Sequence, residues 1–378
     1  MIKIVHVITG LGGGGAERML VRVATKSDRK HFETLVVSMT DDGVQGSALR
    51  EHGVRVVALG MQRGVPDIRG LIRLRRLLVR ERPNIVQTWL YHADLLGLIA
   101  AKLAGVSIIG WNVRCSKMEM QHYRRLTPIV RGTLSIASRF ASFVIVNSLS
   151  GKAFHESLGY RPSRWELIYN GFDLDEFRPD PEARVSVRRE LGAPQDAKLI
   201  GMTARFDPMK DFTTFFRAAA IMNKDAPETH YLLAGPGVDP ENGSLSACIH
   251  EELKGRVHLL GFRSDVRRLT AACDVFTLVS RGEGFPNVVG EAMSCGVPCV
   301  ATDVGDVAFL IGQTGRVVPV EDASGLAAAW RKILDLNIAD RNALGWQARQ
   351  RIREHFDLKA IVGRYEQTYL NMVMSNAI

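Results

Sequence analysis

The chain has 378 residues, of which 46% are hydrophobic and 24% are charged. This length exceeds what one hydrophobic core usually organises, and this composition excludes a largely disordered chain, so we expect a globular protein with two domains. Lys and Arg outnumber Asp and Glu by 25 to 14 in residues 1–175 and number 24 against 26 in residues 176–378, so the net charge of +9 belongs to the first half.

The first half alternates β-branched runs with helical patterns, which is typical of a parallel sheet with crossover helices. In chain order, we expect strands at residues 3–8, 34–39, 54–59, 84–89, 107–111 and 143–147, with helices at 16–24, 68–80 and 93–104 between them. These strands are apolar enough to be buried on both faces.

The pattern breaks near Asn170, where the sequence Tyr169-Asn170-Gly171-Phe172-Asp173 indicates a turn before a proline-bearing linker. A second series of strands is expected at residues 198–203, 230–234, 257–260, 275–279 and 298–302. We therefore predict an α/β protein made of two facing, doubly wound, Rossmann-like domains. Ligands in such sheets bind off the carboxyl ends of the strands, so the two domains are expected to enclose a cleft.

The distribution of charges and cysteines predicts the cellular compartment of the protein. No stretch of eighteen residues lacks a charge, and the N-terminus begins with a strand and a glycine loop instead of a signal peptide. The five cysteines form no CxxC pair, and no nearby histidine completes a zinc set with them. We expect a cytoplasmic protein with reduced thiols and no metal site.

The most specific motif follows the strand expected at residues 275–279. It reads Glu283-Gly284-Phe285-Pro286-Asn287-Val288-Val289-Gly290-Glu291. Pro286 or Asn287 is well placed to start a helix, whose free N–H groups can hold a phosphate. Glu291 then lies about one turn inside that helix, so the motif brings two carboxylates near one mouth.

This segment resembles the Glu-x7-Glu signature of the family-4 retaining glycosyltransferases of the GT-B fold, and residues 296–306 resemble the next strand and glycine turn of that family. The resemblance implies that Glu283 lies beside the transferred sugar and that Glu291 binds the ribose hydroxyls. A carboxylate suits both roles because it can accept from two vicinal hydroxyls at once. The remaining donor-binding residues implied are Gly284, Phe285, Pro286, Asn287, Val288 and Val289.

A second block, Gly201-Met202-Thr203-Ala204-Arg205-Phe206-Asp207-Pro208-Met209-Lys210-Asp211, closes the first strand of the second half. It resembles the family segment whose cations bind the donor diphosphate, which assigns that role to Arg205 and Lys210. Two cations at a strand end can neutralise the nucleotide as its bond to the sugar breaks. Taken singly, either residue would be an ordinary surface cation.

The first half contributes further candidates at expected strand ends. Gly13, Gly14 and Gly15 belong to a five-glycine turn that could be mistaken for a dinucleotide site, but no acidic residue ends the second strand as an NAD site requires. In the family, this loop resembles the segment that meets the donor phosphates. His92 is the candidate for the active-site histidine near the sugar, and Arg114 and Trp89 are candidates for the acceptor side.

The resemblance implies that residues 1–172 form the acceptor-side domain, that residues 173–355 bind the nucleotide sugar, and that a helix within 356–378 crosses back to the first domain. The expected reaction is transfer of one sugar, with retention, from a UDP-, GDP- or ADP-sugar to an oligosaccharide or lipid-linked acceptor. The segments around His92 and Trp111 resemble a subgroup tied to surface-polysaccharide (O-antigen or capsule) assembly. A sugar-nucleotide epimerase and a catalytically idle partner protein are the alternatives.

Cofactors and partners complete the prediction. Asp173-Leu174-Asp175 spells the metal-binding triplet of the other glycosyltransferase fold, but it lies in the interdomain turn, so no metal is expected. A helix face carries Arg69, Arg73, Arg76 and Arg80 opposite Ile68, Leu71, Leu74 and Leu78. Together with Lys117, Arg124, Arg125, Arg131 and Arg139, this face is either an ordinary solvated surface or a patch for the inner face of an anionic membrane. Nucleic acid is not expected, because no basic segment interleaved with aromatic residues is present.

Overall fold

The computed structural model describes residues 1–62, 65, 67–114 and 126–376, with residues 126–131 described by their backbone alone. The chain divides into two compact units: unit 1 comprises Met1–Gly171 and Leu358–Ile378, and unit 2 is Phe172–Asp357. The boundaries expected from the sequence, after residues 172 and 355, lie one and two residues from these divisions.

Unit 1 is built on a parallel sheet of seven strands in the order β3-β2-β1-β4-β5-β6-β7. Its strands are β1 (Ile2–Ile8), β2 (Phe32–Ser38), β3 (Arg55–Ala58), β4 (Ile85–Trp89), β5 (Ile108–Val113), β6 (Phe143–Val146) and β7 (Trp165–Leu167). Every residue of β4, β5 and β6 is buried, which requires cover on both faces of the sheet. The register pairs Ile8 with Trp89 and Trp89 with Asn112, so the carboxyl ends of β1, β4 and β5 lie side by side.

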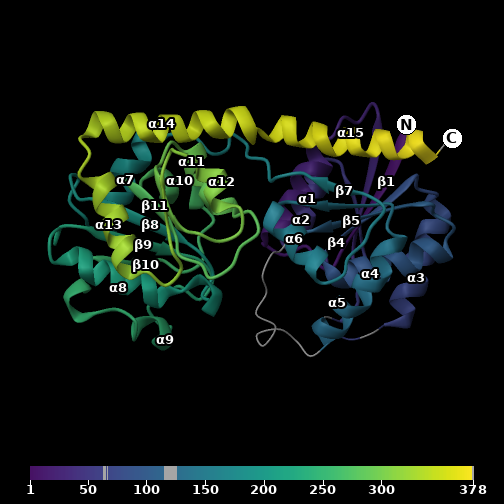
Figure 1. Cartoon of the computed structure of the whole chain (residues 1–378), viewed down its shortest axis with the longest axis horizontal. Helices are drawn as coiled ribbons and strands as arrows, with labels where there is room; N and C mark the ends of the chain where they lie inside the picture. Colours follow the sequence, from purple (N-terminus) through teal and green to yellow (C-terminus); the bar gives the residue numbers. More distant parts are fainter. Residues whose placement is uncertain (63–64, 66, 115–125, 377–378) are drawn as a thin grey trace. The chain divides into compact units, whose positions relative to one another are not determined.

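Helices supply that cover (Figure 1). They are α1 (Gly15–Lys26), α2 (Gln45–Glu51), α3 (Ile68–Glu81), α4 (Tyr91–Leu103), α5 (Leu126–Ala137), α6 (Leu149–Ser157) and α15 (Leu358–Asn376). The helices α3, α4 and α5 pack in a row on one face, and α15 packs against α1 on the other.

The last helix, α15, is tied to the sheet of unit 1 by two tyrosines. Asn112 of β5 donates to the Tyr365 hydroxyl at 3.1 Å, and the Tyr369 hydroxyl donates to Gln87 of β4. All four side chains are buried. The end of the sequence therefore completes the interior of the first unit.

Unit 2 repeats the architecture with six parallel strands in the order β10-β9-β8-β11-β12-β13. The strands are β8 (Leu199–Thr203), β9 (His230–Ala234), β10 (Val257–Leu259), β11 (Val275–Leu278), β12 (Cys299–Thr302) and β13 (Arg316–Val318). The helices are α7 (Pro181–Leu191), α8 (Phe212–Asn223), α9 (Gly243–Ser246), α10 (Val266–Ala271), α11 (Asn287–Ser294), α12 (Val307–Ile311), α13 (Ala323–Leu334) and α14 (Ile338–His355). The helices α8 and α13 pack together, as do α11 and α14.

The prediction of two doubly wound α/β domains is confirmed, but Ile68 does not lie with the leucines opposite the arginines of its helix, as the sequence predicted. Leu74 and Leu78 of α3 are buried as expected, but Ile68 is 75% exposed. At 100° per residue, Ile68 shares a stripe with Ile72 and Val79, which are also exposed and lie beside the buried face instead of on it. The second half of the basic patch expected from the sequence, Lys117, Arg124, Arg125 and the Arg131 side chain, lies outside the described residues.

Candidate functional site

In unit 2, the candidate residues follow three adjacent strands. The strands β8, β11 and β12 are neighbours in one parallel sheet, so their carboxyl ends share an edge. Lys210 follows β8 in a short 3₁₀ turn, and Glu283 follows β11. Parallel topology therefore brings together two loops that are about seventy residues apart in the sequence.

Lys210 and Glu283 form an ion pair at this edge. The Lys210 ammonium contacts Glu283 Oε1, and both side chains are mostly buried, with exposed fractions of 20% and 17%. The Ser280 hydroxyl donates to the same carboxylate oxygen at 2.9 Å. A carboxylate that is held from two sides by a cation and a hydroxyl has a fixed orientation, so its position is set before any ligand arrives.

Hydrogen bonds donated by backbone amides also hold the segments that follow β8 and β11 in place. The Arg281 amide donates to the Met209 carbonyl at 2.9 Å, and the Ser280 amide donates to the Thr302 hydroxyl at 2.9 Å. Gly305 lies so close to the Glu283 loop that a Cβ would be 2.4 Å from the Glu283 carbonyl oxygen. The sequence prediction did not include Ser280 or Thr302, although both directly follow or end predicted strands.

The helix expected after Gly-Phe-Pro is α11, which begins at Asn287 with Pro286 as its N-cap. No side chain caps this end, so its first amides point out of the helix. Glu291 is 1% exposed inside α11, and the Phe285 ring is buried between Phe172 and Phe356 at centroid distances of 6.4 and 5.3 Å. The side chain of Phe285 thus anchors the loop, and contact of the loop backbone with a donor stays a prediction.

Gly290 is the position in this motif that tolerates no side chain. A Cβ there would lie 2.1 Å from Cζ of Phe172, which is itself fully buried. We expect Gly290→Ala to lower the free energy of unfolding by about 1–3 kcal/mol through overpacking. Urea unfolding would measure the loss, and Gly243→Ala, whose Cβ would meet nothing within 4 Å, is the control. Equal stability of the two variants would contradict this packing.

Arg205 lies two residues beyond β8 and is 61% exposed. Its guanidinium pairs with Asp207 at 2.8 Å, and Asp207 also caps the turn that leads to Lys210 by accepting from the Met209 amide. Arg205 and Lys210 therefore belong to one short structured segment. The predicted roles of Arg205, Lys210, Glu283 and Glu291 toward a nucleotide sugar stay predictions.

In unit 1, the candidates follow β1, β4 and β5. Gly14 is the N-cap of α1 and Gly15 its first residue, while a Cβ on Gly13 would meet nothing within 4 Å. His92 is the second residue of α4 and is partly buried. Since β1 and β4 are parallel neighbours, the glycine turn and His92 lie at the same edge of the sheet.

Trp89 and Arg114 have structural partners inside unit 1. Trp89 is fully buried, stacks on Tyr365 and donates to His6, whose pKa burial lowers to about 3, so that His6 is neutral. Arg114 donates to the Tyr365 hydroxyl at 3.3 Å and to Asn170, and lies over the Trp89 ring. Contact of either residue with an acceptor stays a prediction; in this structure both pack around α15.

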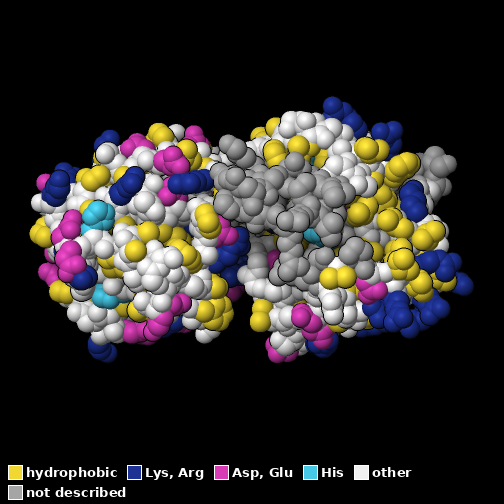
Figure 2. Space-filling view, turned by 90° about the horizontal axis from the view of Figure 1, so that it is seen from below, with side chains coloured by type: hydrophobic (Ala, Val, Ile, Leu, Met, Phe, Trp, Pro, Cys, Tyr) yellow, Lys and Arg dark blue, Asp and Glu magenta, His cyan; other side chains and the backbone are white. Residues whose placement is uncertain are grey.

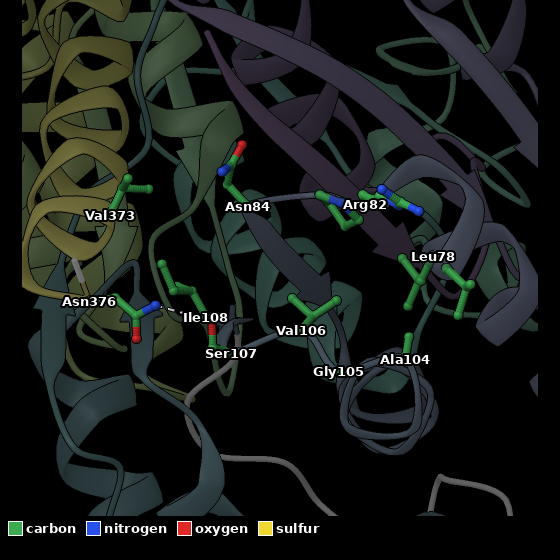
Figure 3. A pocket seen from close by; sticks show the side chains of 12 residues that line it. Leu78, Arg82, Asn84, Ala104, Gly105, Val106, Ser107, Ile108, Val373 and Asn376 are labelled. Carbon is green, nitrogen blue, oxygen red and sulfur yellow. Dashed lines mark hydrogen bonds between the residues drawn. The ribbon is translucent and has the colours of Figure 1, made fainter.

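A separate hollow of about 500 Å³ lies elsewhere in unit 1 (Figure 3). Its wall includes Asn84 and Ile108, at the beginnings of β4 and β5, and the end of α15, where Asn376 donates to the Ser107 hydroxyl at 3.1 Å. This is the amino edge of the sheet, opposite the carboxyl edge that carries His92. The hollow therefore is not the predicted site.

The described residues contain neither a metal-ligand cluster nor a membrane-spanning helix. No group of three or more His, Cys, Asp or Glu side chains there could hold a metal ion. Among the same residues, no helix has both the length and the apolar character needed to cross a bilayer.

Two family models match the chain. The model described as Glycosyltransferase Family 4 matches residues 13–176, and the model described as Glycosyl transferases group 1 matches residues 197–336. The first match falls almost wholly in unit 1 and the second in unit 2.

Relatives and solved structures agree with these matches. The chain is 27% identical over 319 residues to the Escherichia coli UDP-Gal:alpha-D-GlcNAc-diphosphoundecaprenol alpha-1,3-galactosyltransferase, covering 82% of this chain and 81% of that protein. It is 26% identical to the lipopolysaccharide core biosynthesis glycosyltransferase LpsE of Rhizobium meliloti, covering 97% and 98%. The crystal structure of Anabaena HepE in complex with UDP aligns with a TM-score of 0.82 at 24% identity, covering 98% and 100%, which shows a shared fold.

Proposed function

Because the chain belongs to glycosyltransferase family 4 and has the GT-B fold, we propose that it transfers one sugar from a UDP-sugar to a lipid-linked or oligosaccharide acceptor, with retention at the anomeric carbon, during cell-surface polysaccharide assembly. The relatives support the substrate classes. The name of the Escherichia coli relative specifies a UDP-sugar and a diphosphoundecaprenol-linked acceptor, and that of the Rhizobium relative specifies lipopolysaccharide.

The observation that carries this proposal is the Lys210–Glu283 ion pair at the carboxyl ends of β8 and β11. In the absence of ligand, Glu283 neutralises Lys210. An arriving diphosphate takes over that neutralisation and frees the carboxylate to accept hydrogen bonds from sugar hydroxyls. The pair thus couples donor binding to sugar orientation.

The reaction that we propose is the one that membership of the family implies. The acceptor hydroxyl oxygen forms a bond to the anomeric carbon on the face from which the β-phosphate oxygen departs, and the hydroxyl proton passes to that oxygen. Lys210 and Arg205 offset the charge that develops on the leaving nucleotide diphosphate. Glu291 holds the ribose, and His92 lies near the transferred sugar.

The direct test uses the purified chain. Thermal shifts with UDP, GDP, ADP and their sugars identify the nucleotide, since at equal concentration the ligand that binds the folded state more tightly stabilises it more. A labelled sugar is then offered with a polyprenyl-diphosphate sugar acceptor, and NMR gives the anomeric configuration of the product. Inversion, or no product with any donor, would contradict the proposal. Conversion of the nucleotide sugar without an acceptor would favour the epimerase.

The surface of α3 and α4 supports a second part of the proposal, that the enzyme works at an anionic membrane. We define the α3–α4 face by the exposed residues Ile68, Arg69, Ile72, Arg73, Arg76, Val79, Arg80, Ile99 and Leu103. Arg75 donates to the Leu103 carbonyl at 3.0 Å and joins the two helices. Figure 2 shows hydrophobic and basic side chains side by side on this part of the protein, at the right of the view. Such a mixture suits the boundary between lipid headgroups and acyl chains.

Charge reversal on this face is expected to weaken binding to anionic liposomes. We expect Arg69→Glu combined with Arg76→Glu to weaken it about 30-fold or more, at about 1 kcal/mol per lost arginine. Sedimentation with phosphatidylglycerol vesicles would measure this. The control, Arg217→Glu with Arg267→Glu, makes the same change of net charge at exposed positions of unit 2. Equal effects of both pairs, or binding that does not depend on anionic lipid, would exclude this face.

A further inference from the structure

The turn between β4 and α4 is strained at the residue that precedes the helix. Leu90 has φ 75° and ψ 149°, at the border of a backbone region that is almost exclusive to glycine. His92 follows two residues later, at the mouth of the sheet. A leucine persists in such a conformation only where its surroundings impose it.

One restraint on this turn is a buried hydrogen bond between the two elements that it connects. The Thr88 hydroxyl on β4 donates to Asp94 Oδ1 in the first turn of α4, and both side chains are inaccessible to solvent. The bond therefore spans Leu90 and His92. Gly97 lets the helix approach the strand closely, because a Cβ there would lie 2.3 Å from Thr88 Cγ2.

Asp94 is unusual in being a fully buried carboxyl without a counter-ion among the described residues that contact it. Its second oxygen, Oδ2, is buried and has no hydrogen-bond partner in the described part of the chain. Burial raises the pKa of Asp94 well above its usual value, so its neutral form persists to higher pH. Burying a carboxyl lowers the stability of the fold unless hydrogen bonds or a counter-ion compensate for the lost hydration.

A second restraint holds the residue beside His92. The Tyr91 hydroxyl lies 2.8 Å from His155 Nε2, and His155 Nδ1 lies 2.7 Å from the Gly151 carbonyl oxygen. Because the carbonyl only accepts, Nδ1 carries the proton and Nε2 accepts from Tyr91. Tyr91 is thereby fixed to α6, and His92 is held between two anchored neighbours.

We propose that Thr88 and Asp94 are positioning residues for the transfer reaction: their buried hydrogen bond holds the strained turn at Leu90 and so fixes His92 at the edge where the glycine turn of residues 13–15 also lies. The inference rests on the proposed function of His92. It assigns to a buried carboxyl and a strained leucine a role that neither the family motifs nor the exposed residues indicate.

The test compares Thr88→Val, Thr88→Ser and, as a matched control, Thr277→Val. Thr277 is also a buried strand threonine, and its hydroxyl accepts a hydrogen bond from the Trp330 indole N–H in unit 2. All variants are assayed below their melting temperatures. We expect Thr88→Val to lower kcat by about 10- to 100-fold, the order expected from a displacement of about 1 Å in a catalytic group, with donor KM and UDP affinity unchanged. Thr88→Ser restores kcat, and Thr277→Val loses only stability.

Leu90→Gly supplies the second test, because glycine adopts the observed backbone angles without strain. Without the backbone strain at this residue, the turn needs the Thr88–Asp94 hydrogen bond less to keep its conformation. We therefore expect the double variant Thr88→Val, Leu90→Gly to have a higher kcat than Thr88→Val alone, and so to recover part of the loss. A loss of stability unrelated to His92 would show no such recovery.

The outcomes separate this inference from the proposed function. If the wild-type enzyme transfers sugar and His92→Ala impairs it, but Thr88→Val retains the kcat of Thr277→Val, the positioning role is wrong and the proposed function stands. If Leu90→Gly does not raise the kcat of the Thr88→Val variant, the Thr88 hydrogen bond does not act by opposing the backbone strain at Leu90. If the wild type transfers no sugar, both proposals fail together.

Discussion

Replacing Glu283 with glutamine is expected to lower kcat for sugar transfer by about 10²–10³-fold, the scale found when one preorganised electrostatic contact is removed from an active site. The amide keeps the shape of the side chain and can still accept from Ser280. It cannot neutralise Lys210, and it has one accepting oxygen where the carboxylate has two, so it cannot accept from two vicinal sugar hydroxyls through separate oxygens. Affinity for free UDP is expected to stay the same or rise, because Lys210 is released for the diphosphate.

Initial rates with a UDP-sugar and calorimetric titration with UDP would separate these two effects. The matched control is Glu251→Gln, since Glu251 also pairs with a lysine, Lys254, at 2.6 Å, but both side chains are largely exposed. Surface pairs of this kind contribute little. Transfer at the wild-type rate by the Glu283 variant would show that this carboxylate is not part of the site.

Replacing Lys210 with methionine is expected to have an effect of similar size with a different signature. The variant loses the cation that offsets the leaving diphosphate, so both kcat and UDP affinity fall, with kcat reduced about 10²-fold or more. It also leaves Glu283 mostly buried without its cation, which weakens binding of an anionic ligand further.

The double variant tests whether the two residues act as one unit. Because they contact each other, the losses from Glu283→Gln and Lys210→Met are expected to be less than additive in free energy. Lys254→Met serves as the exposed control. Full additivity, or unchanged UDP affinity in the Lys210 variant, would mean that the pair does not couple donor binding to sugar orientation.

Sequence patterns that extend over only a few residues predicted most of the fold. Alternating apolar strands and helices sufficed for two parallel sheets, and the Gly-Phe-Pro segment correctly predicted a helix from Asn287. The strands β7 and β13 were missed, because each has three residues of which one is charged, Glu166 or Arg316, so neither offers a clear apolar run. Ile68 was misplaced because an apolar residue at a helix start fits both a core stripe and an exposed one.

The sequence could indicate candidate site residues, whose roles stay predictions, but not their geometry. Glu283 and Lys210 stand out by motif, yet their ion pair depends on the adjacency of β11 and β8, which the chain order alone does not specify. Arg114 illustrates the opposite case. Its partners Tyr365 and Asn170 come from distant parts of the sequence and could not be predicted, and its contact with an acceptor stays a prediction. Leu90 gives no signal in the sequence, since its strain exists only in the folded backbone.

The placement of α15 has a consequence for how the protein is made. Unit 2 is a continuous stretch of chain and can fold once its own residues have been synthesised, whereas unit 1 lacks Tyr365 and Tyr369 until the whole of unit 2 has been translated. In the nascent protein, Gln87 and Asn112 gain their partners on α15 only after unit 2 has been made. The strands of unit 1 are therefore synthesised before unit 2 but acquire the contacts of α15 after it, so a variant truncated before Tyr365 is expected to lose stability in unit 1.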